Sequence, residues 1–128
     1  MLGTMMDFPL TVATILERAG KYFPAVEIVS RMPDRSIHRS NYGQVYRRAR
    51  ALAESLLRAG MKRGDRVATL MWNHAAHMET YCGVPVAGGV AHTLNLRLHA
   101  DDLAYIANHA EDRFLIVDDV LLPLYEKI

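Results

Sequence analysis

The clearest pattern along the chain is an apolar stripe at helical spacing. Its members recur every three or four residues: Tyr42, Val45, Tyr46, Ala49, Leu52, Ala53, Leu56 and Leu57. Charged side chains fall largely outside this stripe, which predicts an amphipathic helix that buries one face. Asn41 can cap its first turn, with Gln44 in the capping-box position, and Gly60 suits a left-handed stop.

Downstream of this helix, short apolar segments typical of strands alternate with helical patterns. The predicted strands are Arg66–Trp72, Val90–Leu94 and the wholly apolar Phe114–Val117. Between them we expect a helix capped by Asn73 that runs toward Gly88-Gly89, a helix capped near His99-Ala100, and a last helix over 120–128. Such alternation predicts an α/β fold, with a parallel sheet and helices on both of its faces.

The first forty residues precede this pattern and have a different one. A helix is predicted from Thr11, followed by a short hairpin from Val26–Ser30 to 37–39 with a turn around Pro33-Asp34. We therefore expect a flexible N-terminus over residues 1–8 and one α/β unit over 9–128. Within that unit, 9–40 form the helix and hairpin, and 41–128 form the alternating part.

Composition and charge exclude several classes of protein. The 128 residues are 51% hydrophobic and 23% charged, which predicts a folded domain. The net charge of +1 does not favour nucleic-acid binding. Arg50, Glu54 and Arg58 are spaced four residues apart, and we expect them to form a salt-bridged ladder on a solvated helix face. The lone Cys82 is interpreted as a small buried residue of a reducing compartment. Without a long apolar run or a signal peptide, a cytoplasmic location is expected.

Several residues invite a chemical interpretation that their spacing does not support. His74 and His77 are three apart and lack the glutamate of a zincin helix, so we interpret them as surface residues and predict no metal site. Gly83, Gly88 and Gly89 match neither a Walker loop nor a dinucleotide fingerprint, and the last two are interpreted as a helix end.

Asp118 and Asp119 follow the last predicted strand, at the sheet edge where ligands usually bind. They could hold a metal or a ribose there, but we favour their use as caps of the last helix. No serine lies in a nucleophile elbow. We therefore assign no catalytic, cofactor-binding or metal-binding residue in this chain.

The order of several motifs resembles one family. These are Asn41 to Gln44, Gly60, Gly64 to Ala68, Asn73, Gly88-Gly89, Leu94 to Leu98 (LNLRL) and His109 to Asp112 (HAED). Together they resemble the N-terminal part of the acyl-adenylate-forming enzymes, in the branch of the medium- and long-chain fatty-acid–CoA ligases (acyl-CoA synthetases). The resemblance implies that ATP and magnesium activate a fatty acid as its acyl-adenylate, which is then transferred to coenzyme A.

The family's own catalytic motifs have no matching positions in this sequence. These are the Ser/Thr/Gly-rich phosphate loop ending in Pro-Lys-Gly, the Thr-Glu motif, the ribose-binding Asp and the lysine of the C-terminal domain. The resemblance therefore implies the first portion of a larger domain, which is inactive alone and itself binds no cofactor. ATP, magnesium and coenzyme A are implied for the full-length parent, and the last helix is expected to be interrupted at Ile128.

An alternative is a self-contained α/β module for protein interaction or small-ligand binding. For the fragment, the expected partners are the rest of the parent enzyme, the parent's fatty-acid substrate, and a second copy of the chain. The second copy is expected because a sheet cut after three strands exposes an unpaired edge. No nucleic acid and no transmembrane segment are expected.

Overall fold

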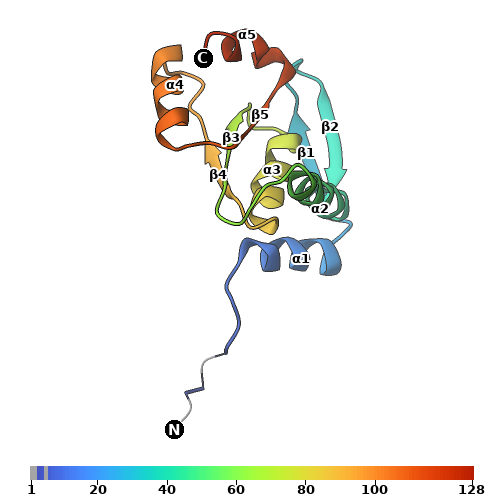
Figure 1. Ribbon diagram of the computed structural model, residues 1–128. Helices are drawn as coiled ribbons and strands as arrows, with labels where there is room; N and C mark the ends of the chain where they lie inside the picture. The colour runs from blue at the N-terminus through green and yellow to red at the C-terminus, as the bar shows by residue number, and fades with distance from the viewer. Residues whose placement is uncertain (1–2, 5) are drawn as a thin grey trace.

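In the computed structural model, which describes residues 3–4 and 6–128, two sheets are combined with helices on several sides (Figure 1). Every strand among the described residues has five residues or fewer, whereas the second helix, with 17 residues, is the longest element. In chain order the elements are α1 (Val12–Tyr22), β1 (Glu27–Arg31), β2 (Ile37–Asn41), α2 (Tyr42–Arg58), β3 (Arg66–Leu70), α3 (Ala75–Val86), β4 (Val90–Thr93), α4 (Ala100–His109), β5 (Phe114–Val117), the 3-10 turn η1 (Asp119–Leu121) and α5 (Leu122–Tyr125).

The three later strands form one parallel sheet in the order β4-β3-β5. Val67 of the central strand is in register with Ala91 on one side and Phe114 on the other. The predicted parallel arrangement is confirmed. Strand β3 ends at Leu70, earlier than the predicted Trp72, because the Trp72 N–H leaves the ladder and donates to the Asp118 carboxylate at 2.8 Å.

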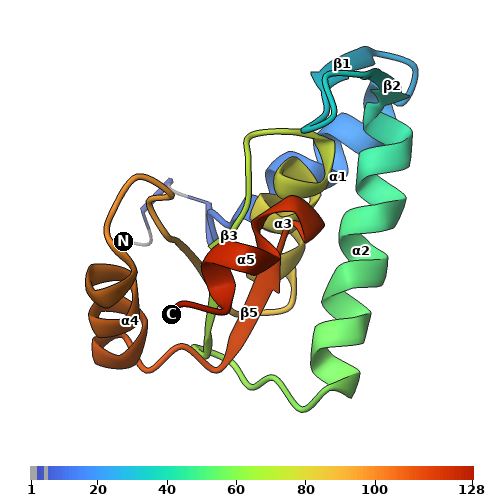
Figure 2. The same ribbon diagram turned by 90° about the horizontal axis from the view of Figure 1, so that it is seen from above.

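Each face of this sheet is covered by its own helices, which confirms the predicted α/β class. On one face, Val67 of β3 packs with Leu56 of α2 and Val84 of α3. On the other face, Leu70 packs with Leu103 of α4, and Leu124 of α5 joins the same cluster. Figure 2 shows α2 and α4 on opposite sides of β3. Alternate side chains of the strands thus supply two separate cores.

Helix α2 begins and ends as its sequence predicts. Asn41 Oδ1 accepts from the Gln44 N–H at 2.9 Å, and Gln44 Oε1 accepts from the Asn41 N–H at 3.1 Å, so the capping box is confirmed. Gly60 has φ +92°, the left-handed conformation expected of a helix stop. Where α2 crosses α3, a Cβ on Gly83 would lie 2.8 Å from the Ala49 carbonyl oxygen, so the crossing requires glycine.

The N-terminal helix and hairpin are also confirmed, and they pack beside α2 and α3. Strands β1 and β2 pair antiparallel, with Glu27 opposite Asn41. Only part of the apolar face of α1 is covered, since Leu16 is buried but Ile15 is 71% exposed. Of the N-terminus predicted to be flexible, residues 1, 2 and 5 lie outside the described residues, and residues 6–8 are exposed without helix or strand.

The predicted continuous helix over 120–128 is wrong. The segment forms the 3-10 turn η1 and then the four-residue helix α5, which ends at Tyr125. Pro123 stands at the start of α5, where its missing N–H is tolerated, and this residue separates the two turns. Within the described part of the chain, every helix is too short or too polar to cross a bilayer.

Candidate functional site

The first of two clusters of polar side chains lies at the carboxyl edge of the parallel sheet. The Asp118 carboxylate accepts from the Trp72 N–H at 2.8 Å and contacts His74 Nε2 at 2.9 Å. Its backbone N–H donates to the Leu70 carbonyl at 3.0 Å, so one buried residue joins the ends of β3 and β5. The predicted capping role is wrong for Asp118, whose side chain makes no cap bond, whereas the exposed Asp119 accepts from the Val120 N–H at 2.7 Å.

His74, not the predicted Asn73, caps helix α3. Its Nδ1 accepts from the Ala76 N–H at 3.3 Å, while Nε2 faces the Asp118 carboxylate. These two contacts require the tautomer with hydrogen on Nε2, because only a bare Nδ1 can accept. Sequence reasoning missed this cap because the acid that orients the ring lies 44 residues away.

His77 is buried as well, so the interpretation of both histidines as surface residues is wrong. Its Nε2 lies 3.0 Å from Thr69 Oγ1, and its ring stacks on Tyr81 at a centroid distance of 4.5 Å. Burial lowers the pKa of His77, and the charge of Asp118 opposes that effect only in part. The lowered pKa favours the neutral form of the ring, which packs in the core. No set of three metal-ligating side chains occurs within the described residues.

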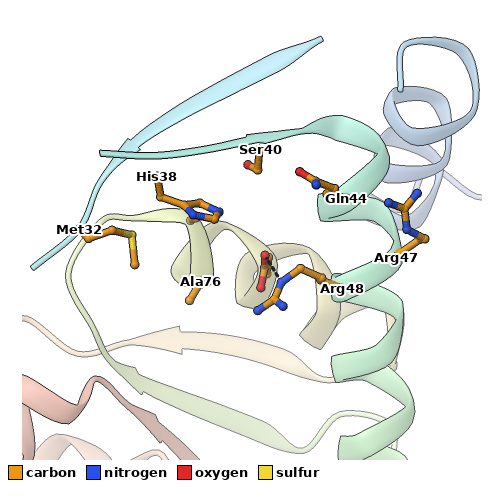
Figure 3. Close-up of a pocket in the computed structure, with 9 residues that line it drawn as sticks. Met32, His38, Ser40, Gln44, Arg47, Arg48 and Ala76 are labelled. Carbon is orange, nitrogen blue, oxygen red and sulfur yellow. Dashed lines mark hydrogen bonds and ion pairs between the residues drawn. The ribbon is translucent and has the colours of Figure 1, made fainter. Parts of the chain in front are cut away.

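The second site is a surface hollow of about 390 Å³ between β2, α2 and α3 (Figure 3). Most of the polar groups that face it are hydrogen-bond donors, so we call it the donor-rich hollow. It is lined by Met32, His38, Ser40, Gln44, Arg47, Arg48, Ala75, Ala76 and Glu79.

One ion pair in the donor-rich hollow joins α2 to α3. Arg48 Nε lies 2.6 Å from Glu79 Oε1, as the dashed line in Figure 3 marks. The Glu79 side chain is only 11% exposed, whereas the Arg48 side chain is 68% exposed. The hydrogen bond to Glu79, followed by the carboxylate charge, raises the pKa of Arg48 above its ordinary value. The two charges compensate one another.

The other polar side chains of the hollow carry unused donors. Ser40 Oγ is buried and has no hydrogen-bond partner among the described residues. Gln44 uses its oxygen in the capping box, and within the described residues its amide nitrogen and the Arg47 guanidinium have no hydrogen-bond or ion-pair partner. The sequence predicts a capping role for Gln44 and assigns Arg47 to no site. A usable signal was present: His38 and Ser40 share one face of a strand, and Gln44 and Arg47 share one face of a helix.

Three further predictions concern the charged ladder on α2, the glycines after α3, and Cys82. Arg58 pairs with Glu54 at 3.3 Å, but Arg50 contacts Glu17 of α1 at 3.9 Å, so the predicted ladder is only half formed. Gly88 has φ +84° and its N–H donates to the Pro85 carbonyl at 2.9 Å, which confirms the helix end. Cys82 is half-buried, and burial raises the pKa of its thiol.

Comparison with known proteins gives a consistent picture. The sequence profile described as "AMP-binding enzyme" matches residues 16–127. A long-chain-fatty-acid–CoA ligase of Thermus thermophilus is 50% identical over 126 residues, which are 98% of this chain and 23% of that protein. A medium-chain-fatty-acid–CoA ligase of Ectopseudomonas oleovorans is 41% identical over 128 residues, 100% of this chain and 23% of that protein.

Solved structures agree on the fold. The anthranilate CoA ligase AuaEII, in complex with anthranoyl-AMP, superposes with a TM-score of 0.79 at 28% identity, covering 95% of this chain and 23% of that one. The N-terminal domain of FACL13 from Mycobacterium tuberculosis gives a TM-score of 0.84 at 24% identity, covering 94% of this chain and 30% of that one. The present chain spans about a quarter of the length of the curated relatives it matches.

Proposed function

The chain belongs to the AMP-binding enzyme family, and from this premise we propose that it forms the N-terminal part of an ATP-dependent fatty-acid–CoA ligase. The whole enzyme would join a fatty acid to AMP, with release of pyrophosphate, and then transfer the acyl group to the thiol of coenzyme A. The observation that carries this proposal is the 50% identity to the Thermus long-chain-fatty-acid–CoA ligase over 98% of the chain.

Within such an enzyme, this chain would act as a scaffold. Residues 9–128 would be the first portion of a larger domain, in which further strands can extend the sheet. Support comes from the pairing of the strands: β3 pairs on both sides, whereas in the described part of the chain β4 and β5 each pair on one side. A larger sheet would continue from these open edges.

ATP and magnesium would be bound by other parts of the enzyme. Asp118, the best-placed carboxylate at the ligand-binding edge, is occupied by His74 and the Trp72 N–H, so its geometry does not fit a magnesium ion that demands several free oxygens. Asp119 is exposed and its Oδ1 accepts from the next backbone N–H. We therefore derive no step of catalysis through the residues of this chain.

Location and assembly form part of the same proposal. A cytoplasmic enzyme is supported by the free, half-buried Cys82, which suits a reducing compartment. Self-association is supported by the open edges of β4 and β5 and by large apolar side chains that remain exposed, such as Ile15 and Trp72.

The test begins with the reading frame beyond Ile128. We expect it to continue into a Ser/Thr/Gly-rich loop ending in Pro-Lys-Gly, and the full-length product to catalyse ATP–pyrophosphate exchange that depends on fatty acid. Addition of coenzyme A should then yield the acyl-CoA. A folded full-length product that does neither with acids of short, medium and long chain would contradict the proposal.

The alternative, a self-contained α/β module that binds a small ligand, is favoured by one observation. The donor-rich hollow is built wholly from residues of this chain. A stop codon directly after Ile128, together with a stable folded chain, would support this alternative over the ligase fragment.

A further inference from the structure

The donor-rich hollow has more hydrogen-bond donors than acceptors, and we propose that it binds a phosphate-type oxyanion. The proposal concerns this chain's own residues and goes beyond the ligase function, in which no ligand is assigned to the hollow. The binding group would be the tetrahedral anion itself, either as free phosphate or as the phosphate of a larger molecule.

The charge of the hollow favours an anion. Four ionisable side chains face it: His38, Arg47, Arg48 and Glu79. Arg48 and Glu79 neutralise one another at 2.6 Å. Arg47 then remains as an uncompensated cation, since it has no ion pair within residues 3–4 and 6–128. A guanidinium with its donors free is well suited to phosphate because two parallel N–H groups can bind two oxygens.

Neutral side chains of the hollow offer further hydrogen-bond donors to an anion held by Arg47. Within the part of the chain that the structure describes, Ser40 Oγ is buried without a partner, an arrangement that destabilises a folded protein unless a ligand or water completes it. The Gln44 amide nitrogen and the outer nitrogens of Arg48 are likewise unused. Ser40 on β2 and Gln44, Arg47 and Arg48 on α2 line the same hollow (Figure 3). Donors from two elements are therefore available to one ligand.

This arrangement suits a tetrahedral oxyanion better than a flat carboxylate, which one guanidinium could satisfy alone. A volume of about 390 Å³ leaves room for a phosphate together with the group that carries it. The backbone of α2 contributes nothing, because its first N–H groups are used: Tyr42 donates to the Val26 carbonyl and Gly43 to the Pro24 carbonyl, each at 3.1 Å. The side chains of the hollow would do the binding.

The experiment is a titration of the 128-residue chain at constant ionic strength, followed by its ¹H–¹⁵N amide spectrum. Inorganic phosphate should shift the amides of residues 38–48 saturably, and acetate at equal concentration should bind at least tenfold more weakly. Arg47→Gln should weaken phosphate binding at least tenfold. Arg58→Gln is the matched control on the same helix, where the side chain is 80% exposed and pairs with Glu54, and it should leave binding unchanged.

Ser40→Ala separates a binding role from a structural one. Because Ser40 Oγ has no partner in the fold, we expect the variant to keep or raise its unfolding midpoint while its phosphate affinity falls severalfold. Unchanged affinity in both Arg47→Gln and Ser40→Ala, equal binding of acetate, or shifts confined to other residues would overturn the proposal.

Two further ligands identify the source of the phosphate. AMP that binds like inorganic phosphate supports recognition of the phosphate alone, and tighter AMP binding supports a nucleotide as its source. Adenosine that binds as tightly as AMP would overturn the proposal, because the phosphate would then contribute nothing. All of these measurements are independent of ligase activity, so failure here and failure of the proposed function are distinguishable.

Discussion

Asp118 and His74 form a buried pair, with Nε2 of the imidazole 2.9 Å from each carboxylate oxygen. The contact connects the residue that follows β5 with the residue that caps α3, and the same carboxylate also accepts from the Trp72 N–H at 2.8 Å. A single acidic side chain thereby holds together the carboxyl ends of two strands and the start of a helix.

Replacement of this acid should be costly. We expect Asp118→Asn to reduce the free energy of unfolding by about 2 kcal/mol, because hydrogen bonds to a charged acceptor are lost or weakened in a buried place. Urea denaturation measures the effect. Asp119→Asn is the matched control, and its cost should stay below about 0.5 kcal/mol because that side chain is exposed. Equal costs for the two variants would contradict the assigned role of Asp118.

Stability should also depend on the protonation of His77. Burial lowers the pKa of this group below its ordinary value of 6.5, so the unfolded chain takes up the proton more readily than the folded chain. The stabilising contribution is complete above pH 6.5 and is lost as the pH falls below that value.

The measurement is the urea midpoint at several pH values between neutral and mildly acidic. His77→Gln should flatten the decline that wild type shows on acidification, because a neutral amide takes up no proton. His99→Gln, at a side chain that is 74% exposed, should leave the decline as it is. A wild-type midpoint that rises on acidification would contradict the sign of this prediction.

The crossing of α2 and α3 should not tolerate an added methyl group. In Gly83→Ala the new Cβ would lie 2.8 Å from the Ala49 carbonyl oxygen and 3.0 Å from Leu52 Cδ2. We expect a loss of about 1–3 kcal/mol in unfolding free energy, the usual cost of overpacking. Gly3→Ala, with nothing within 4 Å, is the control and should be neutral in the same denaturation experiment. A neutral Gly83→Ala would mean that the helices separate more easily than their contact implies.

Self-association remains a prediction that sedimentation can test. The one-sided pairing of β4 and β5 and the exposed apolar side chains lead us to expect a homodimer or a larger species. Analytical ultracentrifugation over a hundredfold range of concentration should show a mass that rises with concentration. A monomer throughout that range would count against the open edges as a contact surface.

The isolated chain should lack adenylation activity. Charge on the transferring phosphate must be stabilised by donors and a cation in fixed positions. We expect the 128-residue chain to show no ATP–pyrophosphate exchange dependent on fatty acid, whereas the proposed full-length enzyme should show it. Robust exchange that disappears in Asp118→Ala while the fold persists would place an active site at the sheet edge.

Features that depend on neighbouring residues could be predicted from the sequence. The capping box of Asn41 and Gln44 uses groups three residues apart, and the strand Phe114–Val117 is marked by its own apolar residues. The division of the predicted helix over 120–128 into η1 and α5 also has a local cause, Pro123, although the apolar pattern alone predicts one helix.

Features that depend on distant residues could not be predicted in this way. His74 caps α3 in an orientation set by Asp118, and Glu79 pairs with Arg48, 31 residues earlier in the chain. The donor-rich hollow is of the same kind, because Ser40 and Arg47 become neighbours of α3 only after the helices have packed. Spacing along the chain places donors on one face of a strand or a helix, but it does not show which elements pack together.

The central position of β3 has a consequence for synthesis of the protein. Both of its partners, β4 and β5, follow it in the sequence, so β3 leaves the ribosome with neither edge paired. Its buried residue Val67 then stays accessible until α3 and β4 have emerged, and Leu70 stays accessible until α4 has emerged. The nascent chain should accordingly pass through an interval in which a chaperone that recognises short apolar segments binds around β3, and that interval should end once β5 has been translated.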